Sequence, residues 1–367
     1  MAQLFENSTI NGMDLANRFV RSATWEGMAA GDGACTPKLT DCMADLAKGG
    51  VGLIITSHAY VSPEGQAAPW QLGVHHDNMV PGLENMAKAV HENHGKIVMQ
   101  LAHAGFFSNA KQTGQAPMAP SNVTGFAKSP RKEMTVEDIQ QIAKSYGAAA
   151  KRAQKAGFDG VQIHAAHGYL LSQFLSPAFN RRNDAYGGEI RQRATAVLEV
   201  LREIRQAVGR DYPVLVKMNC RDFIENGLVL EDSLEVAAML ASEGIDAIEL
   251  SGGVLVGGKL NPSRMEIKFE ENEAYFQEDA AAFKKKVTVP LILVGGNRSY
   301  QVAERLIDEG VADYISMSRP FIREPNLINR WKAGDLSRAT CVSDNMCFRP
   351  AMKGDGVYCL TEEREKK

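Results

Sequence analysis

The segment from Val161 to Tyr169 brings two imidazoles and a phenol together at the end of a short apolar run. His164 and His167 lie three positions apart, and Tyr169 follows two residues later. Just beyond the end of a β-strand, two histidines at this spacing can face one cavity and donate hydrogen bonds near physiological pH. A tyrosine, with an unperturbed pKa of about 10, can deliver a proton to a bound substrate. The grouping therefore predicts a site that stabilises negative charge.

The same histidines allow a second chemistry. Paired histidines in a barrel can bind zinc, but a catalytic zinc ion needs three protein ligands. His58 and His103 could complete a set with His164 and His167, which makes a zinc-dependent hydrolase the second hypothesis. Zinc ligation leaves Tyr169 without a role, and no His-x-His pair follows the first expected strand.

The elements that must position these residues follow a repeating pattern. Short segments rich in valine, isoleucine and leucine alternate with longer stretches of helical apolar spacing. The expected strands are Phe19–Thr24, Gly52–Ser57, Lys96–Leu101, Gly160–His164, Val214–Met218, Ala247–Ser251, Leu291–Val294 and Tyr314–Met317. They are almost continuously apolar, as parallel strands buried on both faces are. Eight units predict an α/β fold, a single (β/α)8 TIM barrel with a short C-terminal extension. The competing doubly wound sheet needs a glycine-rich dinucleotide turn after an early strand, which this sequence lacks.

Capping signals mark the ends of the expected helices. Thr36 precedes Pro37, Thr135 lies three residues before Asp138, and Ser299 precedes a segment of helical spacing. Glycines suited to left-handed helix C-termini follow at Gly157, Gly244 and Gly310. Because barrel enzymes place their chemistry at the C-terminal ends of the strands, polar residues at those ends should share one rim.

Two further features at that rim suggest a charged ligand. Gly295 and Gly296 follow the seventh strand, and Ser318 and Arg319 follow the eighth, where barrels commonly bind phosphate. The alternative is that the glycines only permit a tight turn. Lys217 ends the fifth strand inside an apolar run, where a lysine pairs with an anion or loses its proton. It could face the N1 and C2-carbonyl edge of a flavin, or form a salt bridge to a barrel carboxylate such as Glu249.

Composition restricts the remaining possibilities. The net charge is −3 and the basic residues are scattered, so nucleic acid is not an expected partner. No apolar run reaches the length of a membrane span, which makes a membrane an unexpected partner too. The N-terminus lacks the basic and apolar regions of a secretory signal, and six cysteines are too few for a disulfide scaffold. These features predict a cytoplasmic protein with reduced thiols.

A longer pattern around the histidines carries a family resemblance. The run from Gln162 to Pro177, with the segment from Asn180 to Gly188 after it, closely resembles the Old Yellow Enzyme family of FMN-dependent ene-reductases. The resemblance extends over roughly the whole barrel, through the segment from Gln100 to Gly105 and on to Ser318-Arg319-Pro320. It implies FMN as cofactor, NADH or NADPH as reductant, and a small electrophilic molecule as substrate.

The resemblance also implies roles for individual residues. Those beside the flavin would be Ser22, Ala23, Thr24, Ser57, Gln100 and Lys217, with Gln100 at the pyrimidine edge. Those at its phosphate would be Gly295, Gly296, Ser318 and Arg319. His164 and His167 would hold the oxygen of a carbonyl, nitro or phenolate group, and Tyr169 would be the proton donor. The implied reaction is reduction of an α,β-unsaturated carbonyl compound or a related activated electrophile.

Departures from the family pattern concern the flavin environment and the C-terminus. Trp25 stands where relatives often have cysteine or threonine, so we expect its indole to contact the substrate. Lys217 stands where they typically have arginine. The segment with Cys341, Cys347 and Cys359 resembles a cluster-binding tail with four cysteines, but Asp344 replaces one. We therefore expect residues 1–335 to form the FMN-binding barrel and residues 336–367 a tail with an incomplete cysteine motif. A flavoprotein that transfers electrons through this tail is the third hypothesis, no metal ion is expected, and homo-oligomer formation is left open.

Overall fold

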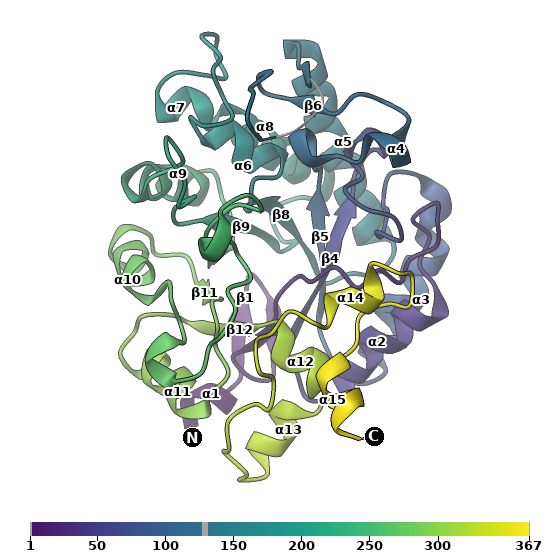
Figure 1. Cartoon of the computed structure of the whole chain (residues 1–367), viewed down its shortest axis with the longest axis vertical. Coiled ribbons are helices and arrows are strands. Elements are labelled where there is room, and N and C mark those ends of the chain that lie inside the picture. The colour runs from purple at the N-terminus through teal and green to yellow at the C-terminus, as the bar shows by residue number, and fades with distance from the viewer. Residues whose placement is uncertain (1, 127–130, 367) are drawn as a thin grey trace.

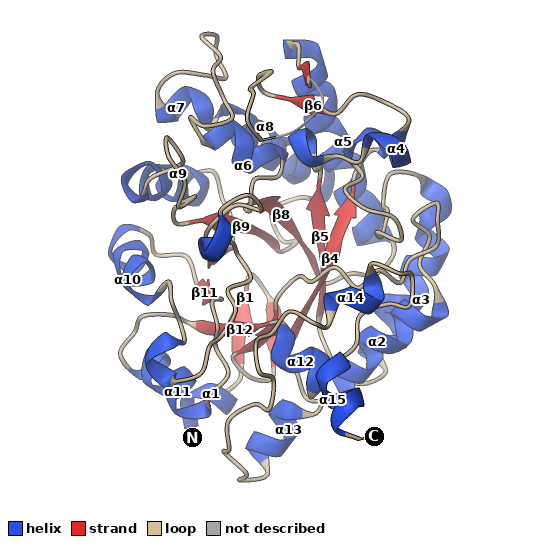
Figure 2. Cartoon of the chain, in the orientation of Figure 1, coloured by secondary structure: helices blue, strands red, loops and turns tan. Residues whose placement is uncertain are grey.

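The computed structural model describes residues 2–126 and 131–366 and contains a closed barrel of eight parallel strands (Figure 2). In barrel order the strands are β10 (Ala247–Ser251), β11 (Leu291–Leu293), β12 (Tyr314–Met317), β3 (Phe19–Arg21), β4 (Leu53–Tyr60), β5 (Ile97–Ala102), β8 (Gly160–Ala165) and β9 (Val214–Asn219). Each overlaps an expected strand, which confirms the TIM barrel. Two strands differ most from their expected bounds. β3 ends at Arg21 rather than Thr24, and β4 continues beyond Ser57 to Tyr60, past a register shift between Ile55 and His58.

Helices surround the barrel, as Figure 1 shows. The main ones are α2 (Pro37–Lys48), α3 (Val80–His91), α5 (Val136–Lys155), α8 (Thr195–Val208), α9 (Leu230–Ser242), α10 (Gln277–Lys286) and α11 (Tyr300–Asp308). Shorter helices are α1 (Ala2–Phe5), α4 (Ala110–Thr113), α6 (Leu170–Leu175), α7 (Ile190–Arg193), α12 (Arg319–Arg323), α13 (Leu327–Lys332), α14 (Phe348–Ala351) and α15 (Leu360–Glu365). None of the described helices has the length and apolar character needed to span a membrane.

The capping predictions are confirmed at α2 and α5 and wrong in one respect at α11. Thr36 accepts from the backbone N–H of Leu39, and Thr135 and Asp138 form a reciprocal capping box. Ser299 occupies the N-cap position of α11 but does not cap the helix. Instead Glu273 Oε2 accepts the backbone N–H groups of residues 298 and 299, at 2.8 and 2.9 Å. A carboxylate from a neighbouring segment thus takes the place of the expected hydroxyl, and its charge suits the helix dipole.

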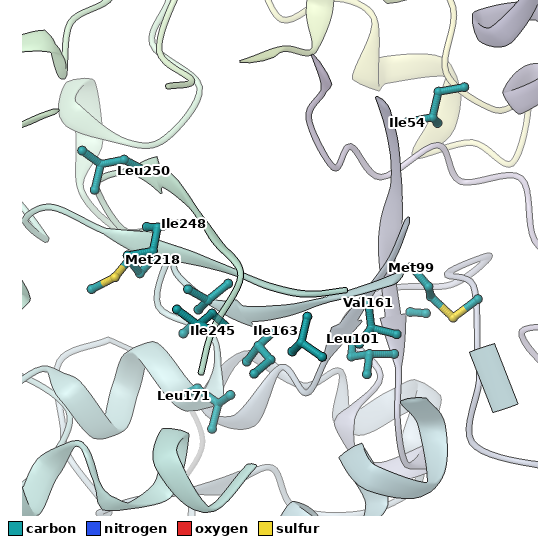
Figure 3. Close-up of a cluster of buried hydrophobic side chains, with 14 of the residues drawn as sticks. Ile54, Met99, Leu101, Val161, Ile163, Leu171, Met218, Ile245, Ile248 and Leu250 are labelled. Atoms are coloured by element: carbon teal, nitrogen blue, oxygen red, sulfur yellow. The ribbon is translucent and has the colours of Figure 1, made fainter. Parts of the chain in front are cut away.

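Alternate residues of the strands point to opposite sides of the barrel wall. Outward side chains such as Ile54, Met99 and Leu250 belong to the core that the strands share with the helices (Figure 3). The strands are buried throughout, as expected, but their inward positions are not uniformly apolar. On β9, for example, Leu215 lies in an apolar cluster near the N-terminal end of the barrel, whereas Lys217 lines a cavity nearer the other end.

A β-hairpin closes the N-terminal end of the barrel. Its strands β1 (Ser8–Ile10) and β2 (Met13–Leu15) pair antiparallel. Ile10, Met13 and Leu15 are buried in one cluster with inward side chains of the barrel strands. Because the hairpin fills the N-terminal end, the opposite end of the barrel is the place for a ligand.

Longer connections gather at the C-terminal end. The β5 to α5 connection includes the short paired strands β6 (Met118–Ala119) and β7 (Lys132–Glu133), and residues 252–276 join β10 to α10. The C-terminal segment after α13 forms α14 and α15 beside α12, drawn in yellow in Figure 1. The expected boundary at residues 335 and 336 falls at the start of this segment.

Candidate active site

A cavity opens at the C-terminal ends of the barrel strands and brings most of the predicted site residues together. Those that line it are Ser22, Ala23, Thr24, Trp25, Gln100, His164, His167, Tyr169, Lys217, Gly296, Ser318 and Arg319. Ser57 and Gly295 do not line it. Ser57 is buried in β4, and its carbonyl accepts the hydroxyl of Thr56 at 2.8 Å. Gly295 lies against Phe276, and a Cβ atom added to this glycine would be 2.9 Å from the phenyl ring.

The two predicted imidazoles and the phenol form one group with His58. The ring centre of His164 is 5.3 Å from that of His167 and 4.9 Å from that of Tyr169, with the rings edge to face in both pairs. The Tyr169 hydroxyl lies 3.2 Å from Nε2 of His58. His167 has φ +63°, and its backbone N–H donates to Asn219 at 3.1 Å, so a strained conformation is held in place where β8 ends.

Burial determines the protonation of this group. It lowers the pKa of His58 to about 4. Burial also lowers the pKa values of His164 and His167 well below the ordinary value, and the positive charge of Lys217 acts in the same direction. The pKa of Tyr169 is raised by burial. At neutral pH the imidazoles are therefore uncharged and the phenol keeps its proton, which suits donors of neutral hydrogen bonds.

A fully buried polar network lies beneath the cavity. Lys217 Nζ is 3.3 Å from Glu249 Oε1 and donates to Ser22 Oγ at 2.7 Å. Glu249 also accepts from Ser22 at 2.7 Å and from Gln162 at 2.9 Å, and Gln162 in turn accepts from Gln100 at 2.7 Å. Burial would raise the pKa of Glu249, but Lys217 and these donors outweigh it and lower the pKa. Lys217 therefore forms the salt bridge to Glu249 that was one of its two predicted environments, and it also lines the cavity.

The wall formed after β11 and β12 suits an anion. Gly296, with φ +81°, can be only glycine, because a Cβ would lie 2.8 Å from the ring of Tyr275. Arg319 is 8% exposed, and NH1 donates to Asn345 Oδ1 at 2.7 Å. Ser318 Oγ lies 2.6 Å from Thr24 Oγ1, so a residue predicted at the phosphate contacts one predicted beside the flavin ring.

Sequence reasoning missed the contributions of two segments to the cavity. The β10 to α10 connection contributes Leu255, Pro262, Ser263 and Tyr275, and the C-terminal segment contributes Ser343 and Phe348. The length of the β10 to α10 connection was a usable signal, because unusually long connections, even with only short 3-10 turns, are often functional. No motif marks Ser343 or Phe348, since only their packing brings them to the cavity.

The geometry gives the zinc hypothesis no site. His103 does not line the cavity, and its Nδ1 accepts the backbone N–H of Gly105 at 3.0 Å. Within the described residues, no group of three histidine, cysteine, aspartate or glutamate side chains has an arrangement that could hold a metal ion. Cys341, Cys347 and Cys359 of the C-terminal segment are among these described residues.

Comparison with known proteins identifies the family. The NADH:flavin oxidoreductase / NADH oxidase family matches residues 3–336. The chain is 36% identical to the NADH oxidase of Thermoanaerobacter brockii over 349 residues, which are 94% of this chain and 53% of that protein. It is 33% identical to the NADPH dehydrogenase of Bacillus subtilis over 325 residues, 88% of this chain and 92% of that one. The chain thus spans about half the length of the first relative and most of the second.

Solved structures agree with this assignment. A 2-naphthoyl-CoA reductase bound to 2-naphthoyl-CoA has a TM-score of 0.90 and 27% identity, over 97% of this chain and 56% of that one. The Old Yellow Enzyme homologue of Zymomonas mobilis has a TM-score of 0.78 and 26% identity, over 93% and 96% of the two chains. The fold and family define the class of FMN-dependent oxidoreductases that use NADH or NADPH. The chain belongs to the NADH:flavin oxidoreductase / NADH oxidase family, of the Old Yellow Enzyme type.

The cavity fits the cofactor of this family. Nδ1 of His164, Nε1 of Trp25 and Oδ1 of Asn297 are buried without a hydrogen-bond partner in the described part of the chain, and all three side chains line the cavity. Unsatisfied buried polar atoms of this kind are expected where a ligand supplies the partners. Gln100 and Lys217 can meet the polar edge of a flavin, and Arg319 with the backbone at Gly296 can meet its phosphate.

Proposed function

We propose that this protein uses NADH or NADPH to reduce the C=C bond of an α,β-unsaturated carbonyl compound or a related activated electrophile. The observation that carries the proposal is the meeting of His164, His167 and Tyr169 in one cavity with Lys217. Neutral imidazoles and a protonated phenol supply the donors that an enolate-like transition state requires.

The two imidazoles would hold the carbonyl oxygen of the substrate. The Ser251 hydroxyl, 2.7 Å from Nε2 of His167, can donate to that nitrogen and leave Nδ1–H for the substrate. Each well-placed donor contributes about 3 to 4 kcal/mol to stabilisation of the developing oxyanion. Because both pKa values are low, the imidazoles donate without carrying a charge that would need a buried counterion.

Tyr169 would protonate the α-carbon. FMN, when bound, supplies hydride to the β-carbon from its N5 atom. A hydrogen bond between the Tyr169 hydroxyl and Nε2 of His58, 3.2 Å apart, would hold the phenol in place before reaction. Trp25, whose indole lines the cavity, would contact the acceptor and restrict its shape. The raised pKa of Tyr169 keeps the phenol protonated until the transfer occurs.

Half-reaction kinetics test the role of Tyr169. In Tyr169→Phe, stopped-flow reduction of the flavin by NADPH or NADH should keep its rate, because the phenol takes no part in that step. Reoxidation by cyclohexenone should slow by about 100-fold or more, the usual contribution of a positioned proton donor. Equal losses in the two half-reactions would contradict the proposal, because they would indicate a general defect in the cavity.

Ligand binding tests the imidazole pair separately. The variant with both His164→Ala and His167→Ala should lose the charge-transfer absorbance that a phenolate produces over an oxidised flavin. Gln173→Ala is not a suitable control because its amide binds the backbone of this region, whereas exposed His94→Ala removes an imidazole far from the barrel mouth. Undiminished phenol binding in the double variant would remove the histidines from the acceptor site.

A further inference from the structure

Asn345 of the C-terminal segment contacts Arg319, which lines the cavity at the predicted phosphate site. Its Oδ1 accepts from Arg319 NH1 at 2.7 Å and from the Ser263 hydroxyl at 3.0 Å. Its Nδ2 donates to the Ser263 carbonyl at 2.8 Å. One carboxamide thus joins three elements distant in sequence: the segment after α13, the connection from β10 to α10, and the start of α12, which lie side by side in Figure 1.

The contact leaves the charge of Arg319 uncompensated. Asn345 is the hydrogen-bond partner of this guanidinium within the described residues, and it is neutral. The nearby Asp344 interacts with Arg319 only at longer range, because Thr361 and the backbone of Met346 hold its carboxylate, at 2.6 and 3.0 Å. An arginine that is 8% exposed and oriented by a neutral acceptor keeps its remaining N–H donors and its full charge for an anion.

The thiols around Arg319 do not compete for its charge either. Burial raises the pKa of Cys341, and it raises the pKa of Cys347 to about 12, against the opposing effect of Arg319. Both side chains are therefore neutral thiols at physiological pH. The cysteines of the tail therefore add no negative charge beside the guanidinium, although thiols can be anionic in other surroundings.

The backbone of the segment is held in the conformation that this contact needs. Ser343 and Asn345 have φ values of +57° and +58°, in the left-handed region. The Arg298 guanidinium donates to the carbonyl of Cys341 and, at 3.3 Å, to that of Ala339 and to the Ser343 hydroxyl. Asparagine tolerates this conformation better than most residues, because its short side chain can satisfy nearby polar groups.

We propose that Asn345 is a positioning residue that orients Arg319 toward the phosphate of FMN, so that the C-terminal segment braces the phosphate end of the cofactor site. This inference depends on the assignment of Arg319 to the phosphate. It does not depend on the electron acceptor, because it concerns cofactor binding alone.

Comparison of FMN with riboflavin isolates the phosphate. Protein freed of flavin is titrated with each compound, and binding is followed by quenching of flavin fluorescence. In Asn345→Ala, FMN affinity should fall by about tenfold, the loss expected when a charged donor is no longer oriented. Riboflavin affinity should change less than about twofold, because riboflavin has no phosphate for Arg319 to contact. In Asn345→Asp, FMN affinity should fall further, since a carboxylate would pair with Arg319 in place of the phosphate.

Two controls separate the explanations. Met352→Ala shortens a side chain of the same segment that is 69% exposed and does not contact Arg319, so it should leave both affinities unchanged. Arg319→Ala should reduce FMN affinity and leave riboflavin affinity nearly constant. If Arg319→Ala does not change the ratio of the two affinities, the phosphate assignment itself is wrong. If Arg319→Ala changes the ratio but Asn345→Ala lowers both affinities equally, or Met352→Ala has the same effect as Asn345→Ala, the positioning role of Asn345 is wrong.

Discussion

The N-terminal end of the barrel is filled by apolar side chains, whereas the C-terminal end of the same strands carries a fully buried ion pair and four uncharged titratable rings. At the closed end, Leu15 of the hairpin packs into a cluster with Leu215 of β9. At the open end, Lys217 of that strand pairs with Glu249 beneath the cavity. Leu215 and Lys217 are only two positions apart on β9, yet the first lies in a region that stabilises the fold and the second in a region that serves chemistry.

The two ends differ in whether they contain backbone strain and buried polar atoms without hydrogen-bond partners. The closed end gains free energy from burial of apolar area, at roughly 25 cal/mol per Å². The open end retains polar atoms without partners, such as Nδ1 of His164, and a left-handed backbone at His167. A well-packed closed end can offset these unfavourable features, which a binding site needs before its ligand arrives.

The largest effect is expected at the buried ion pair. Lys217→Met leaves the Glu249 carboxylate, which is 0% exposed, without its counterion. Breaking a buried pair from one side typically costs about 3 to 5 kcal/mol. Urea denaturation should show this loss in the free energy of unfolding, and Glu249→Gln in the same chain should restore much of it. If Lys217→Met is as stable as the wild type, the open end does not depend on this pair.

The closed end should respond almost as strongly to loss of apolar volume. Leu15 is 1% exposed, and Leu15→Ala should lower the free energy of unfolding by about 2 to 5 kcal/mol. The neighbouring Asp14→Ala changes an exposed position of the same strand and should cost less than about 1 kcal/mol. Flavin reduction by folded Leu15→Ala should keep its rate. A specific loss of that activity, without a loss of stability, would contradict the separation of the two ends.

The smallest effect concerns pH and the open end. The folded pKa of His58 is about 4, below the value of about 6.5 in an unfolded chain. The unfolded state therefore takes up a proton first, and the contribution of His58 to stability is complete above pH 6.5 and is lost as the pH falls towards 4. His58→Asn should reduce the pH dependence of the unfolding free energy in this window by up to about 1.4 kcal/mol per pH unit.

The matched control for this measurement is His94→Asn, which removes an imidazole that folding leaves exposed. Denaturation of both variants at several pH values between 4 and 7 gives the slopes. An unchanged slope in His58→Asn would indicate that the imidazole takes up its proton at nearly the same pH in the folded and unfolded states, so that burial does not lower its pKa.

The regularities that predicted the barrel are local ones. Apolar strand segments and helix caps such as Thr36 and Thr135 depend on residues close in sequence, so they can be identified without the fold. The errors arise where distant residues interact. Glu273 replaces the expected cap of α11. Ser57, next to His58 of the cavity wall, does not line the cavity, and β4 changes register between Ile55 and His58.

The sequence by itself determined the barrel, the family, and the pairing of imidazoles and phenol, because each follows from the order and spacing of neighbouring residues. Only the tertiary structure decided that Lys217 would form an ion pair with Glu249, that the histidines would be uncharged, and that Asn345 would contact Arg319. Those properties depend on burial and on distances between residues far apart in the chain. Burial sets the free energy of a charge, and the packing of distant segments determines which side chains are buried together.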